Sequence, residues 1–398
     1  MTVGKKYAPE WHEYQDPLTG RRVRQLTDSP AEDYHLYFYN PSITPDGKHL
    51  IFLSERTICP KGTNRISNLF RLDLQSGEIV QLTDARPIRA DYWPFTEAIR
   101  GVGSCLPAIG NHGREVFYFE GTGLFAVEVE SFKQRQLLSL PADRRPSMLQ
   151  ANANGDTLVF ATWDEDLFLE RSQRAYAGEK FPDEKFFQET TSTIMRVEAT
   201  TGQAQEILRK EKFWINHVHL HPYNPDLILF CHEYSELPDR MWLLDVANHQ
   251  SGVIPGQGSH EWYQHEFWSA DGKRVCFHGG VTGDNLLGFC GWCSADARNY
   301  TKSYHNTSGR AYAHYNLHPD GETMVTDGEA RPGCISKVHL RDECQVFEVL
   351  CRHDSYTFGD DQRCHPHPSF TPDGKQVIFT SNRTGSSNVY LTDWNGEP

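Results

Sequence analysis

The sequence of 398 residues predicts an all-β fold, a seven-bladed β-propeller whose blades are four-stranded antiparallel sheets. Three observations predict it. A hairpin of two apolar strands and a tight turn recurs seven times along the chain. A second pair of apolar strands follows the copies, and the two ends of the chain each supply part of the last blade. Together these features describe a ring of similar sheets that closes on itself.

The hairpin is the repeating element. Its turn is Asp-Gly or Asn-Gly in most copies, and a glycine there can adopt a positive φ without a steric clash. The fourth copy has an altered turn. The seven copies span residues 41–52, 107–118, 149–160, 220–230, 267–277, 316–325 and 368–379.

The segments between the hairpins supply the remaining strands of each blade. Residues 68–82, 193–202 and 241–246 are examples of this second apolar pair. Successive turns lie roughly 40–70 residues apart, which is the spacing expected for propeller blades of four strands each.

The two ends of the chain predict how the ring closes. The last copy ends at residues 388–393 without an outermost strand, whereas residues 19–27 are similar to the outer strand at 76–83. We therefore expect an N-terminal strand to complete the last blade, which removes a free sheet edge. Residues 1–398 would form one propeller domain, with a charged and aromatic insertion at about 163–191 that includes helix-forming residues.

Composition excludes several classes of protein. The formal net charge is −14 and no Lys/Arg-rich run occurs, so nucleic-acid binding is disfavoured. No apolar stretch approaches the ~18 residues of a membrane span, and residues 1–11 do not look like a secretory signal. The ten cysteines are irregularly spaced, which favours reduced thiols. We expect a cytoplasmic protein that binds neither nucleic acid nor membrane, and whose pocket can still be locally cationic.

Histidines recur at one position of the hairpin. The first strand of a propeller blade lies nearest the axis, so residues at its start meet at the central channel. The residues seven positions before the turn glycine are Asn40, Leu106, Met148, His265, His314 and His367. In the fourth copy, His217 and His219 lie near the same position. We therefore expect imidazoles of blades four to seven to converge at one end of the axis.

Converging imidazoles predict a metal site, because neutral histidine is the commonest ligand of transition metals. His365 lies two residues before His367 and shares its face if this segment is a strand. Gln362 adds an oxygen donor, whose harder character suits Mn²⁺. The predicted ligands are His314, Gln362, His365 and His367, and the predicted cofactor is Mn²⁺ or another divalent transition metal.

Weaker candidates for substrate contacts surround this site. Arg240 opens a strand of blade four and can bind a carboxylate through two hydrogen bonds, although such arginines are more often found in salt bridges at a rim. His232 follows the preceding strand of the same blade. Tyr37, Tyr39 and Asn40 are expected to line the mouth of the channel from blade one. The two tyrosines suit stacking on a sugar, and they suit core packing equally well.

Four motifs and the chain as a whole resemble a known family. The motifs are CHE at 231–233, DRMW at 239–242, HEFW at 265–268 and QRCHPHPSFTPDG at 362–374. The sequence resembles the oligogalacturonate lyases (polysaccharide lyase family 22), which belong to the wider group of TolB-like propellers. The resemblance covers essentially the whole chain, and its most specific part is the His-Pro-His block with the glutamine before it.

The resemblance implies a reaction and roles for particular residues. It implies cleavage of short galacturonides, saturated or Δ4,5-unsaturated, by β-elimination to 5-keto-4-deoxyuronate. It implies a Mn²⁺ ion on the three histidines and the glutamine named above, a catalytic histidine at His265 and a catalytic arginine at Arg240. Asn40 stands where a longer amide is expected, and Tyr234 where a glycine is usual. These departures leave the preferred substrate open.

The chemistry of such a site can also be argued from the substrate. The C5 proton of a uronate is adjacent to a carboxylate and weakly acidic, so its removal requires stabilisation of the negative charge that develops. A bound metal acts as a Lewis acid, and Arg240 can neutralise a carboxylate. A neutral imidazole can take the proton, and we assign this role to His265, with His232 in reserve. Glu233 and Glu266 suit the orientation of a neighbouring histidine. The group that protonates the leaving O4 is not identified.

Alternative functions remain open on the sequence alone. A lyase for a different uronide would use the same scaffold and the same chemistry. A non-catalytic, TolB-like binding propeller would have no use for a His-Pro-His block at the axis. A metal-dependent lactonase or hydrolase propeller would favour carboxylate and amide ligands over three histidines.

Overall fold

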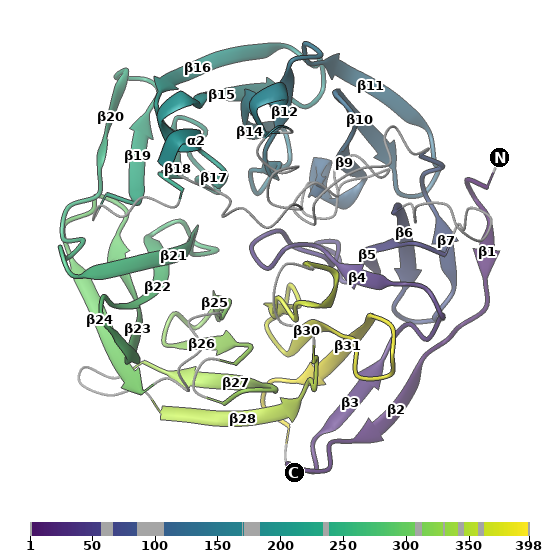
Figure 1. Cartoon of the computed structure of the whole chain (residues 1–398). Helices are drawn as coiled ribbons and strands as arrows, with labels where there is room; N and C mark the ends of the chain where they lie inside the picture. Colours follow the sequence, from purple (N-terminus) through teal and green to yellow (C-terminus); the bar gives the residue numbers. More distant parts are fainter. Residues whose placement is uncertain are drawn as a thin grey trace.

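A computed structural model describes residues 2–56, 67–85, 107–168, 170, 184–233, 239–306, 313–328, 331–340, 346–356 and 362–396. In this part of the chain the strands form seven antiparallel sheets that are arranged around a central axis (Figure 1). The fold predicted from the sequence, a seven-bladed β-propeller, is therefore confirmed. Some sheets gain a fifth strand from an N-terminal segment or from a divided inner strand.

The first four blades follow one another along the chain. Blade one has β4 (Asp33–His35), β5 (His49–Ser54), β6 (Asn68–Asp73) and β7 (Ile79–Gln81), with β1 (Lys6–Tyr7) outside them. Blade two has β8 (Ala108–Gly110), β9 (Glu115–Glu120), β10 (Gly123–Glu128) and β11 (Gln134–Ser139). Blade three has β12 (Arg144–Pro146), β13 (Gln150–Ala151), β14 (Thr157–Asp164), β15 (Thr191–Glu198) and β16 (Ala204–Glu211). Blade four has β17 (Val218–Leu220), β18 (Leu227–Cys231), β19 (Met241–Asp245) and β20 (Gln250–Val253).

The last three blades complete the ring. Blade five has β21 (Glu261–Trp268), β22 (Arg274–Val281), β23 (Asp284–Ser294) and β24 (Tyr300–Asn306). Blade six has β25 (Tyr315–Leu317), β26 (Thr323–Thr326), β27 (Cys334–His339) and β28 (Val346–Arg352). Blade seven has β29 (Ser369–Phe370), β30 (Gln376–Ser381), β31 (Asn388–Asp393), β3 (Arg22–Gln25) and β2 (His12–Gln15).

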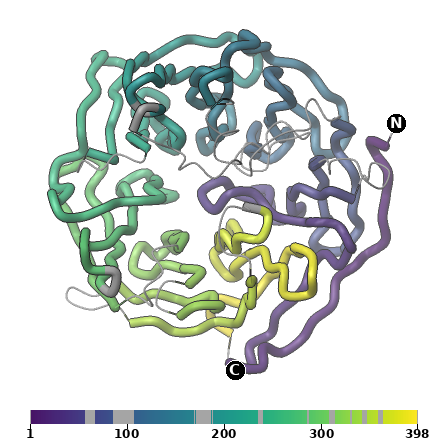
Figure 2. The backbone as a smooth tube through the Cα atoms, in the orientation of Figure 1, coloured from purple at the N-terminus to yellow at the C-terminus, as the bar shows by residue number. Residues whose placement is uncertain are grey.

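The N-terminal strands close the ring as the sequence predicted. β3 pairs with β31, and β2 pairs with β3 (Figure 1). The tube in Figure 2 shows these N-terminal strands running along the outside of the C-terminal blade. Val23 of β3 is fully buried in one apolar cluster with Val377 and Phe379 of β30. The two ends of the chain therefore share a core, and the outer edge of β31 is paired.

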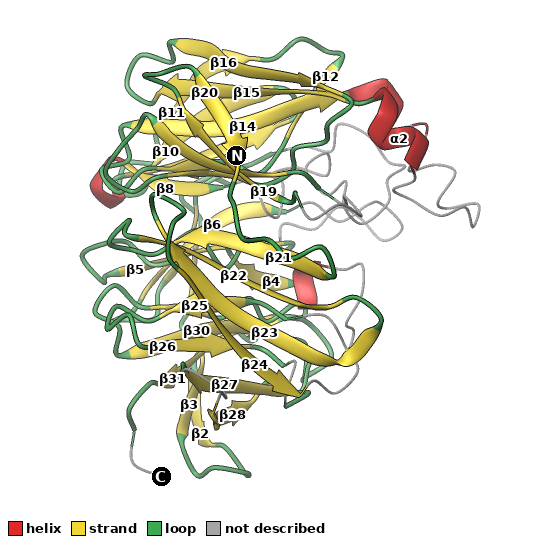
Figure 3. Ribbon diagram, turned by 90° about the vertical axis from the view of Figure 1, so that its left-hand side faces the viewer, coloured by secondary structure: helices red, strands yellow, loops and turns green. Residues whose placement is uncertain are grey.

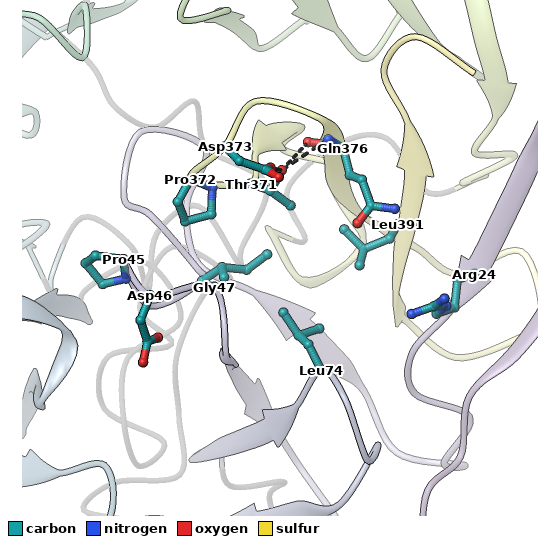
Figure 4. A pocket seen from close by; sticks show the side chains of 11 residues that line it. Arg24, Pro45, Asp46, Gly47, Leu74, Thr371, Pro372, Asp373, Gln376 and Leu391 are labelled. Atoms are coloured by element: carbon teal, nitrogen blue, oxygen red, sulfur yellow. Dashed lines mark hydrogen bonds between the residues drawn. The ribbon is translucent and has the colours of Figure 1, made fainter. Parts of the chain in front are cut away.

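Tight turns join the inner strands of each blade, and glycine is required in them. Gly47 and Gly374 have φ values of 72° and 70°, a region that side chains other than glycine rarely adopt. In blade seven the hydroxyl of Thr371 donates to Asp373 and accepts the backbone N–H of Gln376 (Figure 4). The Asp-Gly turns that were predicted from the sequence thus fix the register of the hairpins.

A pocket of about 410 Å³ lies between the turns of blades one and seven (Figure 4). Arg24 and Leu74 border it together with the two Pro-Asp-Gly turns. None of the predicted site residues is among the residues that line it. This pocket is therefore separate from the histidine cluster described below.

The core is divided among the contacts between neighbouring blades. Leu50 and Phe52 of blade one share a cluster with Ile378 and Val389 of blade seven, and all four are fully buried. Burying a side chain of this size stabilises the fold by about 1.5–3 kcal/mol. Because such clusters recur between blades, the sheets are held as a rigid ring that can position residues at its centre.

A short helix occurs in the stretch predicted to be an insertion. α2 (Glu184–Glu189) projects beyond the sheets on one face of the propeller (Figure 3). Four aromatic side chains anchor this region against blades three and four. They are Trp163, Phe168, Phe186 and Trp214. Within the described residues, no helix has the length and apolarity needed to cross a membrane. The seven cysteines that the structure describes are buried, and none of them is in a disulfide bond.

Candidate active site and metal centre

Histidines from blades five, six and seven lie side by side at the axis. His314 directly precedes β25, and its ring centroid lies 4.4 Å from that of His265 in β21. It also lies 4.3 Å from the ring of His367 and 5.7 Å from that of His365, both just before β29. All four are buried. The common register in the hairpins therefore brings these imidazoles together.

Three of these histidines form a candidate metal centre. His314, His365 and His367 each offer a ring nitrogen, and the three atoms lie within 4.8 Å of one another. Asp327 engages Nδ1 of His314 at 2.8 Å and accepts its backbone N–H at 2.7 Å, so Nε2 is the nitrogen that His314 can offer to an ion. Within the described part of the chain, Nε2 of His367 is buried without a hydrogen-bond partner. An ion would satisfy this nitrogen, and three imidazoles suit a divalent transition metal.

Two residues that support these ligands were not predicted from the sequence. Asp327 directly follows β26 and is fully buried, which raises the pKa of its carboxyl. His35 of β4 lies with Nε2 2.8 Å from the carbonyl oxygen of His367 and Nδ1 2.7 Å from Thr380. Burial lowers the pKa of His35 to about 4, so its ring is neutral at pH 7. Neither residue stands at the repeated register position, which is why the hairpin count missed both.

The segment of His365 and His367 is not a strand, contrary to the expectation from the sequence. β29 begins only at Ser369, and the two prolines in this segment, Pro366 and Pro368, have no N–H to donate to a strand ladder. His367 has a φ of 46°, a conformation that costs about 1–3 kcal/mol outside glycine. The two rings converge because of this local geometry and not through a strand period of two.

Gln362, the predicted fourth ligand, opens the short helix η3 (Gln362–Cys364). Its side chain lies outside what the structure describes, and its role as a ligand stays a prediction. Tyr234, which was expected to affect substrate preference, also lies outside the described residues.

His265 is held in a single orientation. It sits at a bulge of β21, where the pairing register with β22 shifts, and its φ is 52°. Its Nδ1 lies 2.9 Å from the carbonyl oxygen of Ala313 and 2.8 Å from Nε2 of His278. Because a carbonyl only accepts, Nδ1 carries the proton, and Nε2 holds the lone pair. Burial and the nearby His217 lower the pKa of His265 to about 3, so the ring is neutral at pH 7.

Arg240 is held between two carboxylates. Its Nε donates to Glu266 at 2.8 Å and one Nη donates to Glu233 at 2.9 Å, with all three side chains buried. Burial alone would raise the pKa of Glu266, but Arg240 and His217 hold it well below its usual value. The sequence suggested that Glu233 and Glu266 orient a histidine; in the structure both contact the arginine, and Glu266 also lies 3.5 Å from Nδ1 of His217. The remaining guanidinium N–H groups are the ones that a substrate carboxylate can use.

A second group of possible ligands lies next to Arg240. His217, Cys231 and Glu266 place one nitrogen, sulfur or oxygen each within 4.8 Å of one another, and all three are buried. His217 directly precedes β17, and its ring lies 6.2 Å from that of His265 in a near-parallel orientation of 22°. The hairpin register placed His217 near the axis but assigned it no role.

The residues predicted to line the mouth from blade one have different environments. The ring of Tyr37 lies 4.7 Å from His367, 5.9 Å from His314 and 6.0 Å from His217, so it lies next to these three histidines. The hydroxyl of Tyr39 donates to the sulfur of Met148 at 2.8 Å, and its ring lies 4.4 Å from that of His219.

Asn40 and His232 make contacts that point to structural roles. The amide of Asn40 is buried and donates to the carbonyl oxygens of Pro107 and Leu149, which joins blade one to blades two and three. The ring of His232 stacks on Phe213 at 3.8 Å, and its Nδ1 lies 3.3 Å from Asp239. These contacts favour packing over the predicted substrate contact of Asn40 and the predicted reserve role of His232 as a base, and both predictions remain to be tested.

Comparisons with known proteins agree with this geometry. The sequence profile of the oligogalacturonate lyase family matches residues 1–396. The oligogalacturonate lyase of Dickeya dadantii is 24% identical, and the match covers 98% of each chain. The oligogalacturonide lyase of Pectobacterium atrosepticum is also 24% identical, again over 98% of each chain.

Solved structures show the same fold over the same length. An oligogalacturonate lyase in complex with manganese superimposes with a TM-score of 0.81 at 25% identity, covering 99% of this chain and 98% of the other. An oligogalacturonate lyase from Vibrio parahaemolyticus has a TM-score of 0.81 at 22% identity, covering 98% of both chains. The match of the family profile to nearly every residue decides the assignment: this chain belongs to the oligogalacturonate lyase family.

Proposed function

We propose that the protein cleaves short galacturonides, saturated or Δ4,5-unsaturated, by metal-assisted β-elimination, and that the product is 5-keto-4-deoxyuronate. The observation that carries this proposal is the cluster of three buried imidazoles next to the neutral imidazole of His265, in a chain of this family. A lyase of this kind needs a base beside a Lewis acid, and the cluster contains residues suited to both.

The proposed metal is Mn²⁺, because three histidines and an amide suit it and because a structural relative binds manganese. His314, His365 and His367 would hold the ion, with Gln362 as a fourth ligand. When bound, the ion would supply Lewis-acid stabilisation of the substrate carboxylate as C5 loses its proton. Asp327 would orient His314 and increase its basicity toward the ion.

The other side chains act on the substrate directly. Nε2 of His265 takes the C5 proton, since Nδ1 is committed to the carbonyl of Ala313. Arg240 binds a uronate carboxylate through the N–H groups that Glu233 and Glu266 do not use. Tyr37 forms a wall of the site, where its ring can contact the sugar. His232 is the alternative candidate for the base that removes the C5 proton.

The decisive experiment measures uronate release from digalacturonate with and without a chelator. We expect the wild type to be active, to lose activity in chelator and to regain it with Mn²⁺. The variant His365→Ala should lack both bound metal and activity, whereas His12→Ala, on the exposed outer strand β2, should retain both. Activity that persists in chelator, or in a metal-free His365→Ala protein, would refute the role of the metal.

The same assay separates this function from that of a lyase for another uronide. Digalacturonate, diglucuronate and dimannuronate are offered at equal concentration, and the products are identified by mass spectrometry. We expect the highest kcat/KM with digalacturonate. Preferential cleavage of another uronide would keep the reaction and replace the substrate.

A further inference from the structure

The charged groups beside His265 do not balance one another. Arg240 is the partner of both Glu233 and Glu266, at 2.9 and 2.8 Å, and all three side chains are buried. One positive charge against two negative charges leaves a net charge of −1 in this buried cluster. A buried charge without compensation is strongly unfavourable, so a further positive charge is expected within reach.

His217 is placed to carry that charge. Its Nδ1 lies 3.5 Å from Oε1 of Glu266, and neither atom has a hydrogen-bond partner among the described residues. His217 is 5% exposed and Glu266 is fully buried. A proton on His217 pairs these two atoms and neutralises the cluster in one step. The ring is then an imidazolium whose Nδ1–H faces Glu266, and Nε2–H is the donor left to face a substrate.

A metal ion on His217, Cys231 and Glu266 is the competing explanation for these unpaired atoms. The sulfur of Cys231 donates to Glu233 at 3.3 Å and accepts the backbone N–H of His217 at 3.2 Å. A sulfur that donates is a thiol, whereas a metal ligand must be a thiolate. The contacts therefore favour a proton over an ion.

The position of His217 near the proposed base gives the proton on its ring a role in the reaction. The ring centroids of His217 and His265 lie 6.2 Å apart; His217 lies next to Tyr37, and His265 lies next to the predicted ligand His314. O4 and the C5 hydrogen are carried by adjacent carbons of the sugar, and the elimination needs a base at one and a proton donor at the other. We propose that His217 is the general acid that protonates the leaving O4; this rests on the proposed β-elimination.

The bond changes balance without a further reactant. His265 takes the C5 proton, the C5–H electron pair becomes the C4=C5 double bond, and the C4–O4 electron pair leaves with O4. His217 gives its proton to O4, so that the leaving group departs as a neutral hydroxyl. Exchange with water then returns a proton to His217 and removes one from His265.

Several titratable or charged groups surround His217. They are Glu266 at 3.5 Å, the thiol of Cys231 and, beyond these, Glu233, Arg240 and His265. Neutral rings complete its surroundings. They are Tyr37, Tyr39 and His219.

The test compares two leaving groups in His217→Gln. With digalacturonate we expect kcat to fall about 10²–10⁴-fold, with KM nearly unchanged, as for other losses of a general acid. The second substrate is a galacturonate with a 4-nitrophenoxy group at C4. Its leaving group, 4-nitrophenolate, needs no proton, so we expect kcat to stay near the wild-type value. Equal losses with both substrates would overturn the proposal and indicate a structural role.

Controls separate the other outcomes. His221→Gln removes an imidazole from the same blade that contacts the carbonyl of Gly272, and it should retain activity with both substrates. Metal analysis of the wild type should give one ion per chain, unchanged in His217→Gln; a second ion that the variant lacks would overturn the proposal. A wild type that cleaves neither substrate would refute the proposed function itself, and this result differs from a selective loss in the variant.

Discussion

Blades one to three and blades five to seven use the same hairpin and place different residues at the start of its inner strand. In blades one and three this position carries Asn40 and Met148, which connect neighbouring blades: Asn40 donates to two carbonyls and Met148 accepts from Tyr39. In blades five to seven it carries His265, His314 and His367, which face one another. The corresponding residue of blade two lies outside the described residues.

The difference shows where this fold tolerates strain. His265 and His367 have φ values of 52° and 46°, whereas neither Asn40 nor Met148 is among the residues with positive φ. Strained backbone persists only where the surroundings enforce it, and here the carbonyls of Ala313 and His367 are held by imidazoles. At this register position, positive φ among the described residues occurs at His265 and His367, and not at His314, Asn40 or Met148.

The largest expected effect comes from removing an imidazole of the metal centre. His314→Ala should abolish metal binding and lower kcat at least ~10³-fold, because a Lewis acid contributes several kcal/mol to the transition state. Met148→Leu, the matched change at the same register in blade three, should leave metal content intact and change kcat only a few-fold. Metal analysis and steady-state rates check both. If His314→Ala kept its metal, the two halves of the ring would not differ as described.

His265→Gln tests whether one imidazole of this cluster serves the substrate and not the ion. We expect kcat to fall ~10²–10⁴-fold while metal content stays at the wild-type level, since loss of a general base has this magnitude. Metal analysis of the purified variant decides the matter. Loss of the ion would reassign His265 as a ligand.

Asp327→Asn tests the support of the metal centre. The carboxylate fixes the ring of His314 through Nδ1, so its loss should weaken metal affinity about 10–100-fold. Titration of the apo-protein with Mn²⁺ measures this affinity. Saturating Mn²⁺ should restore much of the activity, and failure to do so would show that Asp327 acts in some other way.

The repeated pattern predicted the ring, its closure and the meeting of the histidines, because each depends on local periodicity. Asp-Gly turns fix the hairpins, and their register places His265, His314 and His367 at the axis. The contacts of Arg240 with Glu233 and Glu266 could not be predicted, since they depend on the packing of blade four against blade five.

Local departures from the repeat also could not be predicted from the sequence. The bulge at His265 and the irregular segment before β29 follow from tertiary contacts, and no periodicity reports them. Asp327 and His35 lie outside the repeated register, so a count from the turn glycine passes over them although both contact the ligand residues. The repeat therefore predicted that these histidines meet, and it did not report the residues that orient them; their role as ligands stays a prediction.

The smallest expected effect concerns blade one, where Asn40 was predicted to contact substrate. In the structure its amide donates to the buried carbonyls of Pro107 and Leu149. Asn40→Ala removes both donors, so the free energy of unfolding should fall by about 1–3 kcal/mol while KM for digalacturonate stays within a few-fold of the wild type. Denaturant unfolding and steady-state rates measure the two quantities. A raised KM with unchanged stability would instead place Asn40 among the substrate contacts, and the division between a structural half and a chemical half would then run through blade one.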